Sequence, residues 1–183
     1  MIDPLVGKAI ATAFALLWLL AAWHKLSAGE RFVATLGEYR LLPAAWTRPV
    51  ARLLPFIEAV LGLGWLTGLA SGWIAPLTSA LLGAYAVAIA INLVRGRVHI
   101  GCGCGLGGAS GDDQPLSWWL VARNLALGAV AMTAMLPASQ RELGLLDWVT
   151  LVLALLASVA LYTGASQILR NGAAIASWRK SRG

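Results

Sequence analysis

The sequence predicts an all-α integral membrane protein, a bundle of about five transmembrane helices with one short interfacial helix. Of its 183 residues, 59% are hydrophobic and 12% are charged, whereas an ordinary soluble domain carries about 25% charged residues. The apolar residues form long runs close to the roughly 20 residues that span a bilayer as a helix. The runs lack the alternation of a membrane β-barrel. We therefore expect one membrane domain over residues 1–183 and no strands.

The first predicted span covers residues 5–23, with Lys8 near enough to its start to reach the headgroups. No convincing cleavage site is present, so we expect a retained helix rather than a signal peptide. Residues 24–52 are polar and should contain the interfacial helix, ended by Pro43. The remaining spans are expected at residues 53–70, 73–94, 118–136 and 145–169.

The segment between the third and fourth spans, residues 95–117, contains seven glycines and should be a loop. It also carries the only two cysteines of the chain, Cys102 and Cys104. Many scattered cysteines would predict a disulfide scaffold, whereas two neighbouring ones indicate a local site.

The basic residues indicate how the chain lies in the membrane. Five spans place residues 24–52, the loop 95–117 and the C-terminal tail at one face, which then holds 12 of the 14 Lys and Arg residues against 2 at the other. The positive-inside rule makes the rich face cytoplasmic and puts the N-terminus outside. The net charge of +6 is spread between apolar runs rather than gathered in a basic stripe, so no nucleic-acid partner is expected; the expected surroundings are membrane lipid.

The pair Cys102-Gly103-Cys104 can close a small, strained disulfide, which is easier to reduce than an unstrained one. Arg95 and Arg97 nearby would favour the reactive thiolate. We expect a thiol–disulfide exchange centre. Two alternatives remain open: unreactive thiols in a Gly-rich turn, and a soft-metal site with His99. A closed metal site needs four ligands, so no metal is assigned.

A carboxylate inside a predicted span, Glu58, is costly unless it is paired or functional. Arg123 should lie at a similar depth in the fourth span, and we predict a Glu58–Arg123 ion pair. Such a pair could serve function or only fix the helix register. The supporting polar residues at the same face are then Asn92 and Asn124, expected to hydrogen-bond between helices.

Two histidines complete the candidate site. His24 ends the first span, where an interfacial role is favoured over proton relay. His99 is three residues from Cys102, so it could lower the thiol pKa, or it could be a solvated loop residue.

Several motifs together resemble the MauE family of methylamine utilisation proteins and place the chain near the DoxX-like helical bundles. They are His24-Lys-Leu26, Tyr39-Arg-Leu-Leu-Pro43, Pro55 with Glu58 and Gly62, Asn92–Arg97, Ile100–Gly105, Gln114–Trp119 and Arg123-Asn124. The resemblance covers roughly residues 10–135 and implies a four-helix DoxX-like core plus one further span in the bacterial inner membrane.

The resemblance also implies a function. MauE proteins are needed for active methylamine dehydrogenase, and are thought to act with a thioredoxin-like partner on the disulfides of its periplasmic subunit. Carried over, Cys102 and Cys104 become the redox pair of a thiol–disulfide oxidoreductase. Their cytoplasmic placement by charge conflicts with a periplasmic role, and a bound quinone would supply an electron acceptor within the bilayer. The alternatives are a non-catalytic assembly or maturation factor and, less favoured, a small metal carrier or transporter.

Overall fold

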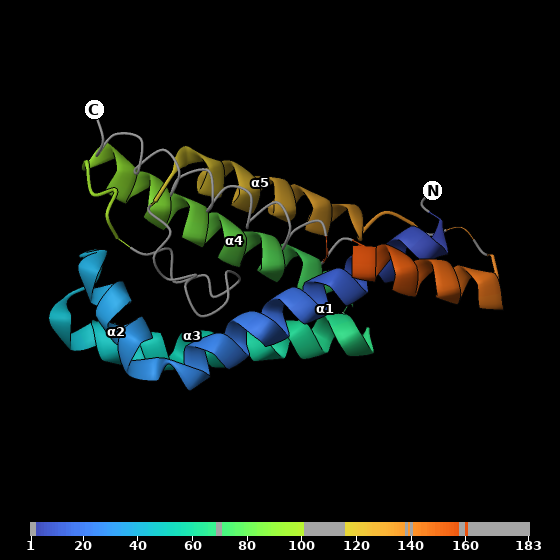
Figure 1. Ribbon diagram of the computed structural model, residues 1–183, viewed down its shortest axis with the longest axis horizontal. Helices are drawn as coiled ribbons and strands as arrows, with labels where there is room; N and C mark the ends of the chain where they lie inside the picture. The colour runs from blue at the N-terminus through green and yellow to red at the C-terminus, as the bar shows by residue number, and fades with distance from the viewer. Residues whose placement is uncertain are drawn as a thin grey trace, which may run out of the picture. The chain divides into compact units, whose positions relative to one another are not determined.

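The computed structural model describes residues 3–68, 71–100, 116–137, 139, 141–157 and 160. All regular elements within these residues are helices, which confirms the predicted all-α class (Figure 1). The labelled helices are α1 (Pro4–Ser27), α2 (Gly29–Glu38), α3 (Ala44–Thr67), α4 (Ser71–Val94) and α5 (Trp118–Thr133), and one further helix covers Leu145–Ala157. The chain divides into two compact units, residues 1–141 and 142–183, and α1–α5 belong to the first.

Among the described residues, three helices are long and apolar enough to cross a membrane: Pro4–Ser27, Ala44–Thr67 and Gly72–Val94. They correspond to the first three predicted spans. α5 has 16 residues, or roughly 24 Å at 1.5 Å per residue, and Leu145–Ala157 is shorter still. The structure therefore supports a membrane protein, while the number of five spans is not established by it.

The ends of the helices follow from local chemistry. The Asp3 side chain accepts a hydrogen bond from the Leu5 backbone N–H at 2.8 Å and caps α1, with Pro4 in the first turn. α3 ends at Gly68, whose φ of 68° is a left-handed conformation that glycine adopts without strain. These caps satisfy backbone groups that a helix end would otherwise leave unpaired.

The helices of the first unit pack as two side-by-side pairs, α1 with α3 and α4 with α5, and α2 lies against the start of α3 (Figure 1). Small residues allow the close approach. A Cβ at Gly62 of α3 would lie 2.8 Å from Cγ of Leu19 in α1. In the other pair, the Ser79 hydroxyl of α4 donates to the Gly128 carbonyl of α5 at 2.8 Å. Small residues at such interfaces are typical of helices packed in membranes.

Two helix ends differ from the expected ones. The interfacial helix α2 ends at Glu38, before Pro43, and Pro43 instead caps the start of α3. α3 begins at Ala44, nine residues before the predicted second span at residue 53. Its first turns carry Arg48, which pairs with Glu30 of α2 at 2.9 Å. Hydropathy marks where a helix becomes apolar, whereas a helix continues into the polar region when side chains there find partners.

Candidate functional site

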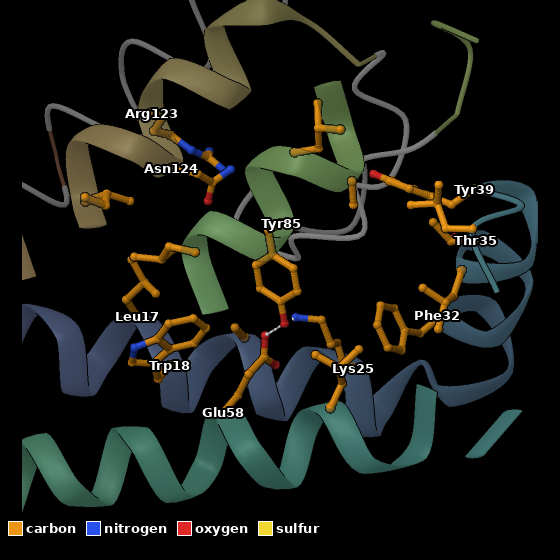
Figure 2. A pocket seen from close by; sticks show the side chains of 18 residues that line it. Leu17, Trp18, Lys25, Phe32, Thr35, Tyr39, Glu58, Tyr85, Arg123 and Asn124 are labelled. Carbon is orange, nitrogen blue, oxygen red and sulfur yellow. Dashed lines mark hydrogen bonds and ion pairs between the residues drawn. The ribbon is translucent and has the colours of Figure 1, made fainter. Parts of the chain in front are cut away.

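A cavity of about 110 Å³ lies inside the first unit, with walls from α1 to α5 (Figure 2). Its lining is mostly apolar and comes from all five helices and the segment between α2 and α3. Polar groups reach it from few side chains: Lys25, Thr35, Tyr39, Glu58, Tyr85, Arg123 and Asn124. An apolar chamber with a few convergent polar groups is the usual form of a small-molecule site.

The cavity contains a buried ion pair. Lys25 Nζ of α1 lies 2.6 Å from Glu58 Oε1 of α3, and the two side chains are 4% and 0% exposed. The Tyr85 hydroxyl of α4 donates to the same oxygen at 2.7 Å. The ammonium also lies 5.4 Å from the ring centre of Phe32 and 5.6 Å from that of Tyr85. One carboxylate oxygen thus links three helices.

The predicted partner of Glu58 was wrong, because Lys25 and not Arg123 forms the ion pair. Sequence reasoning had assigned Lys25 to the basic membrane interface. The buried residues of α1 include Phe14, Trp18, Ala21 and Lys25, which recur at the spacing of one helix face. That register was the signal that could have placed Lys25 inside the bundle.

Arg123 and Asn124 come from α5 and line another side of the cavity, with Tyr85 between them and the ion pair (Figure 2). Asn124 is 3% exposed, and its amide donates to the Leu120 carbonyl at 2.8 Å. Arg123 Nε is buried and has no hydrogen-bond partner among the described residues. The same is true of Glu58 Oε2. Trp18 Nε1, on a third residue of the lining, is also buried without a partner there, so these residues carry two unsatisfied donors and one unsatisfied acceptor.

The remaining predicted site residues lie at the ends of α1 and α4. Asn92 is fully buried, and its amide donates to the Ala88 carbonyl at 3.0 Å within α4 rather than between helices. Arg95 is exposed and its guanidinium reaches the Arg40 carbonyl at 3.5 Å. His99 is exposed, whereas Arg97 and His24 are half-buried, and none of these three lines the cavity.

Cys102 and Cys104 lie outside the described residues, but the two ends of their loop are described. The Leu116 backbone N–H donates to the Val98 carbonyl at 3.0 Å, so the loop starts and ends at one place. Ile100 and Leu116 are buried in a cluster with Tyr39, Ile89 and Leu120. Tyr39 and Ile89 also line the cavity. The cysteine loop is thus anchored beside the cavity.

Tyr39, like Ile89, is a buried residue that belongs to both the loop cluster and the cavity lining. Burial raises the pKa of its hydroxyl from 10.0 to about 12, because the apolar surroundings disfavour the charged phenolate. Among the described residues no group of three or more His, Cys, Asp or Glu side chains could hold a metal ion.

The family model described as "Methylamine utilisation protein MauE" matches residues 4–137, most of the chain and nearly all of α1–α5 and the cysteine loop. The chain belongs to the MauE family. Methylamine utilization protein MauE of Paracoccus denitrificans is 38% identical over 148 residues, 78% of each chain. The protein of that name from Paracoccus versutus is 38% identical over 168 residues, 91% of this chain and 88% of its own.

A third relative, from Methylorubrum extorquens, is 35% identical over 146 residues, 76% of this chain and 77% of its own, and has the same name. No solved structure matches the chain. The MauE family model extends over every residue that lines the cavity and over both cysteines. The predicted resemblance is therefore confirmed, and the chain is a MauE-family membrane protein.

Proposed function

We propose that this chain is a membrane thiol–disulfide redox protein of methylamine utilisation, supporting the disulfide formation or maturation of a partner such as an amine dehydrogenase. The observation that carries the proposal is the place of the cysteine loop. Ile100 and Leu116, which flank Cys102 and Cys104, are anchored on the side chains that line the polar cavity. Chain connectivity alone keeps Cys102 within about 7 Å of Ile100, since a residue spans at most roughly 3.6 Å.

The chemistry is exchange between a dithiol and a disulfide. A thiolate of the partner attacks one sulfur of the Cys102–Cys104 disulfide, and the other cysteine leaves as a thiolate. The second thiolate of the partner then attacks the mixed disulfide. The partner has lost two electrons and gained a disulfide, and the loop holds two thiols after taking up two protons. The reverse sequence reduces a partner.

Arginines at the loop start would assist this exchange. Arg97 is half-buried, and its Nη1 atom is buried without a partner among the described residues. A guanidinium held near a thiol stabilises the thiolate and lowers the thiol pKa. We assign Arg97 and Arg95 this supporting role toward Cys102 and Cys104.

Five spans complete the proposed architecture. α5 runs beside α4 and has no acidic residue, and Leu145–Ala157 is an apolar helix that could begin a further span. Five spans place successive connections on alternate faces of the membrane. The cysteine loop and the basic tail therefore lie at the same face, which is the one predicted to be cytoplasmic. The direct partner there is a thioredoxin-like carrier rather than the periplasmic enzyme itself.

The experiment that tests this function replaces each cysteine by serine in the full chain. Cys102→Ser and Cys104→Ser should each abolish maturation of the amine dehydrogenase, measured as its activity in cells, while the protein stays in the membrane at wild-type amounts. One of the two should accumulate a mixed disulfide with its partner, because the resolving thiol is missing. Near-normal maturation in both variants would overturn the redox proposal and favour an assembly factor.

A further inference from the structure

Three buried polar atoms on residues that line the cavity have no partner among the described residues, and Trp18 Nε1 is one of them. Glu58 is completely buried and only its Oε1 atom is bonded, to Lys25 and Tyr85. Glu58 Oε2 and Arg123 Nε have no partner among the described residues. Leaving a buried charged group partly unpaired inside a membrane protein is unfavourable. A molecule in the cavity that accepts from Arg123 would remove part of this penalty, and a form of it that also donates to Glu58 would remove the rest.

The walls and size of the cavity favour a ring over water. Most lining residues are aliphatic or aromatic, among them Leu17, Trp18, Phe32, Leu82 and Ile89. The volume of about 110 Å³ is on the scale of the roughly 150 Å³ apolar cavity that stays dry and admits benzene. A single six-membered ring fits these limits.

Arg123 and Asn124 lie at one side of this space and the Lys25–Glu58 pair at another, while Thr35 and Tyr39 line a third side (Figure 2). We propose that the cavity binds the ring of a lipid-soluble quinone. One ring oxygen accepts a hydrogen bond from Arg123 and the opposite oxygen accepts from the Lys25 ammonium, because the single Tyr85 O–H already donates to Glu58. After reduction, the hydroxyl at that end donates to Glu58 Oε2.

The redox step rests on the proposed function, whereas the binding does not. Two thiols, Cys102–SH and Cys104–SH, lose two electrons and two protons and form one S–S bond. The quinone takes up both electrons and both protons and leaves as the quinol. The loop disulfide is thereby regenerated after each exchange with a protein partner. Tyr39 packs in the cluster that holds Ile100 and Leu116, at the two ends of the cysteine loop, and also lines the cavity.

Binding can be tested with the full chain in lipid nanodiscs, with decylubiquinone as the probe. The double variant Cys102→Ser/Cys104→Ser is titrated first, so that the result does not depend on thiol chemistry. We expect saturable binding of one quinone per chain. Ala88→Leu fills the cavity wall and should raise the Kd by about tenfold or more. Ala84→Leu, on the exposed face one turn earlier in α4, is the matched control and should bind as the parent does.

Arg123→Gln provides a second variant that keeps the cavity open and removes the charged donor, and it should raise the Kd by about tenfold or more. Absence of saturable binding, or equal binding by the Ala88→Leu and Ala84→Leu proteins, would overturn the quinone site and leave the cavity to water. Failure of the thiol proposal appears separately, as normal maturation with both cysteines replaced. Quinone binding without thiol-dependent maturation would retain the site and reject the redox function.

Discussion

Lys25 and Glu58 join the end of α1 to the middle of α3 through a contact of 2.6 Å between two nearly inaccessible side chains. Each charge depends on the other, because neither water nor lipid can replace the lost partner. Tyr85 adds a third helix through its hydrogen bond to the same carboxylate oxygen. The pair therefore holds the cavity wall in place as well as contributing polar groups to it.

We predict that Lys25→Met destabilises the protein by about 3–5 kcal/mol, because it leaves the Glu58 carboxylate buried and unpaired. The double variant Lys25→Met/Glu58→Leu should recover much of this loss. The measurement is thermal unfolding in detergent. Arg48→Met is the matched control, since Arg48 pairs with Glu30 while 58% and 78% of the two side chains remain exposed, and it should cost at most about 1 kcal/mol. Equal losses of stability in Lys25→Met and Arg48→Met would contradict a structural role for the buried pair.

The raised pKa of Tyr39 predicts that the protein loses stability at alkaline pH. Its pKa is 10.0 when exposed, as in the unfolded chain, and about 12 when folded, so the folded state favours the neutral phenol. The contribution of this group is fully present below pH 10, and is lost as the pH rises through 12. A spectrophotometric titration of tyrosinate should show a step near pH 12 that is missing in Tyr39→Phe. An unchanged late step in Tyr39→Phe would contradict the assignment.

At the residue scale, the sequence identifies Glu58, Arg123 and Asn124 as candidate site residues. All three line the cavity. Hydropathy was sufficient for this, because a polar residue within an apolar run needs a partner. It could not identify Lys25, which stands at the edge of its run beside His24 and resembles an interfacial anchor. Only the helix register, which places Lys25 on the face of Trp18 and Ala21, distinguishes the two roles.

At the scale of elements, close packing of α1 against α3 depends on a missing side chain at Gly62. We predict that Gly62→Ala destabilises the protein by about 1–3 kcal/mol, the usual cost of overpacking. Its Cβ would lie 2.8 Å from Leu19 Cγ and 3.2 Å from the Leu19 backbone nitrogen, and the backbone cannot move aside. Gly83→Ala is the control, because nothing lies within 4 Å of a Cβ there and alanine favours a helix. A Gly62→Ala protein as stable as Gly83→Ala would exclude this close contact.

The helices themselves could be predicted from apolar runs, but their ends could not. The other described helices that match predicted spans begin or end close to a limit of the apolar run. In contrast, α3 starts at Ala44, nine residues before its apolar run. The extension packs against α2, where Arg48 meets Glu30, and these are tertiary interactions. Hydropathy measures transfer to lipid and does not report such contacts. The same limit applies to Asn92, which was expected to bond between helices and bonds within α4.

At the scale of the whole molecule, the distribution of charge sets the orientation in the membrane. Of the 12 basic residues at the predicted cytoplasmic face, Lys25, Arg48, Arg95, Arg97 and Arg123 have contacts or buried atoms within the fold. At the other face Arg141 pairs with Asp3. Leaving these aside, the described basic residues are Arg31, Arg40 and Arg52 at that face and Lys8 at the other, and the four basic residues of the C-terminal tail lie outside the described residues. Among the described residues the asymmetry therefore remains when those with structural contacts are left aside.

We predict that the end of α1 faces the cytoplasm and the end of α3 faces the outside. In a background with both native cysteines replaced by serine, Ser27→Cys and Thr67→Cys each place one thiol at an exposed helix end. A membrane-impermeant maleimide added to intact cells should label the Thr67→Cys protein, and should label Ser27→Cys only after lysis, because basic residues are concentrated at that face and hold it inside. A permeant maleimide, which should label both, controls for burial. The reverse pattern would place the cysteine loop outside, where Cys102 and Cys104 could exchange directly with a periplasmic partner and no thioredoxin-like carrier in the cytoplasm would be required.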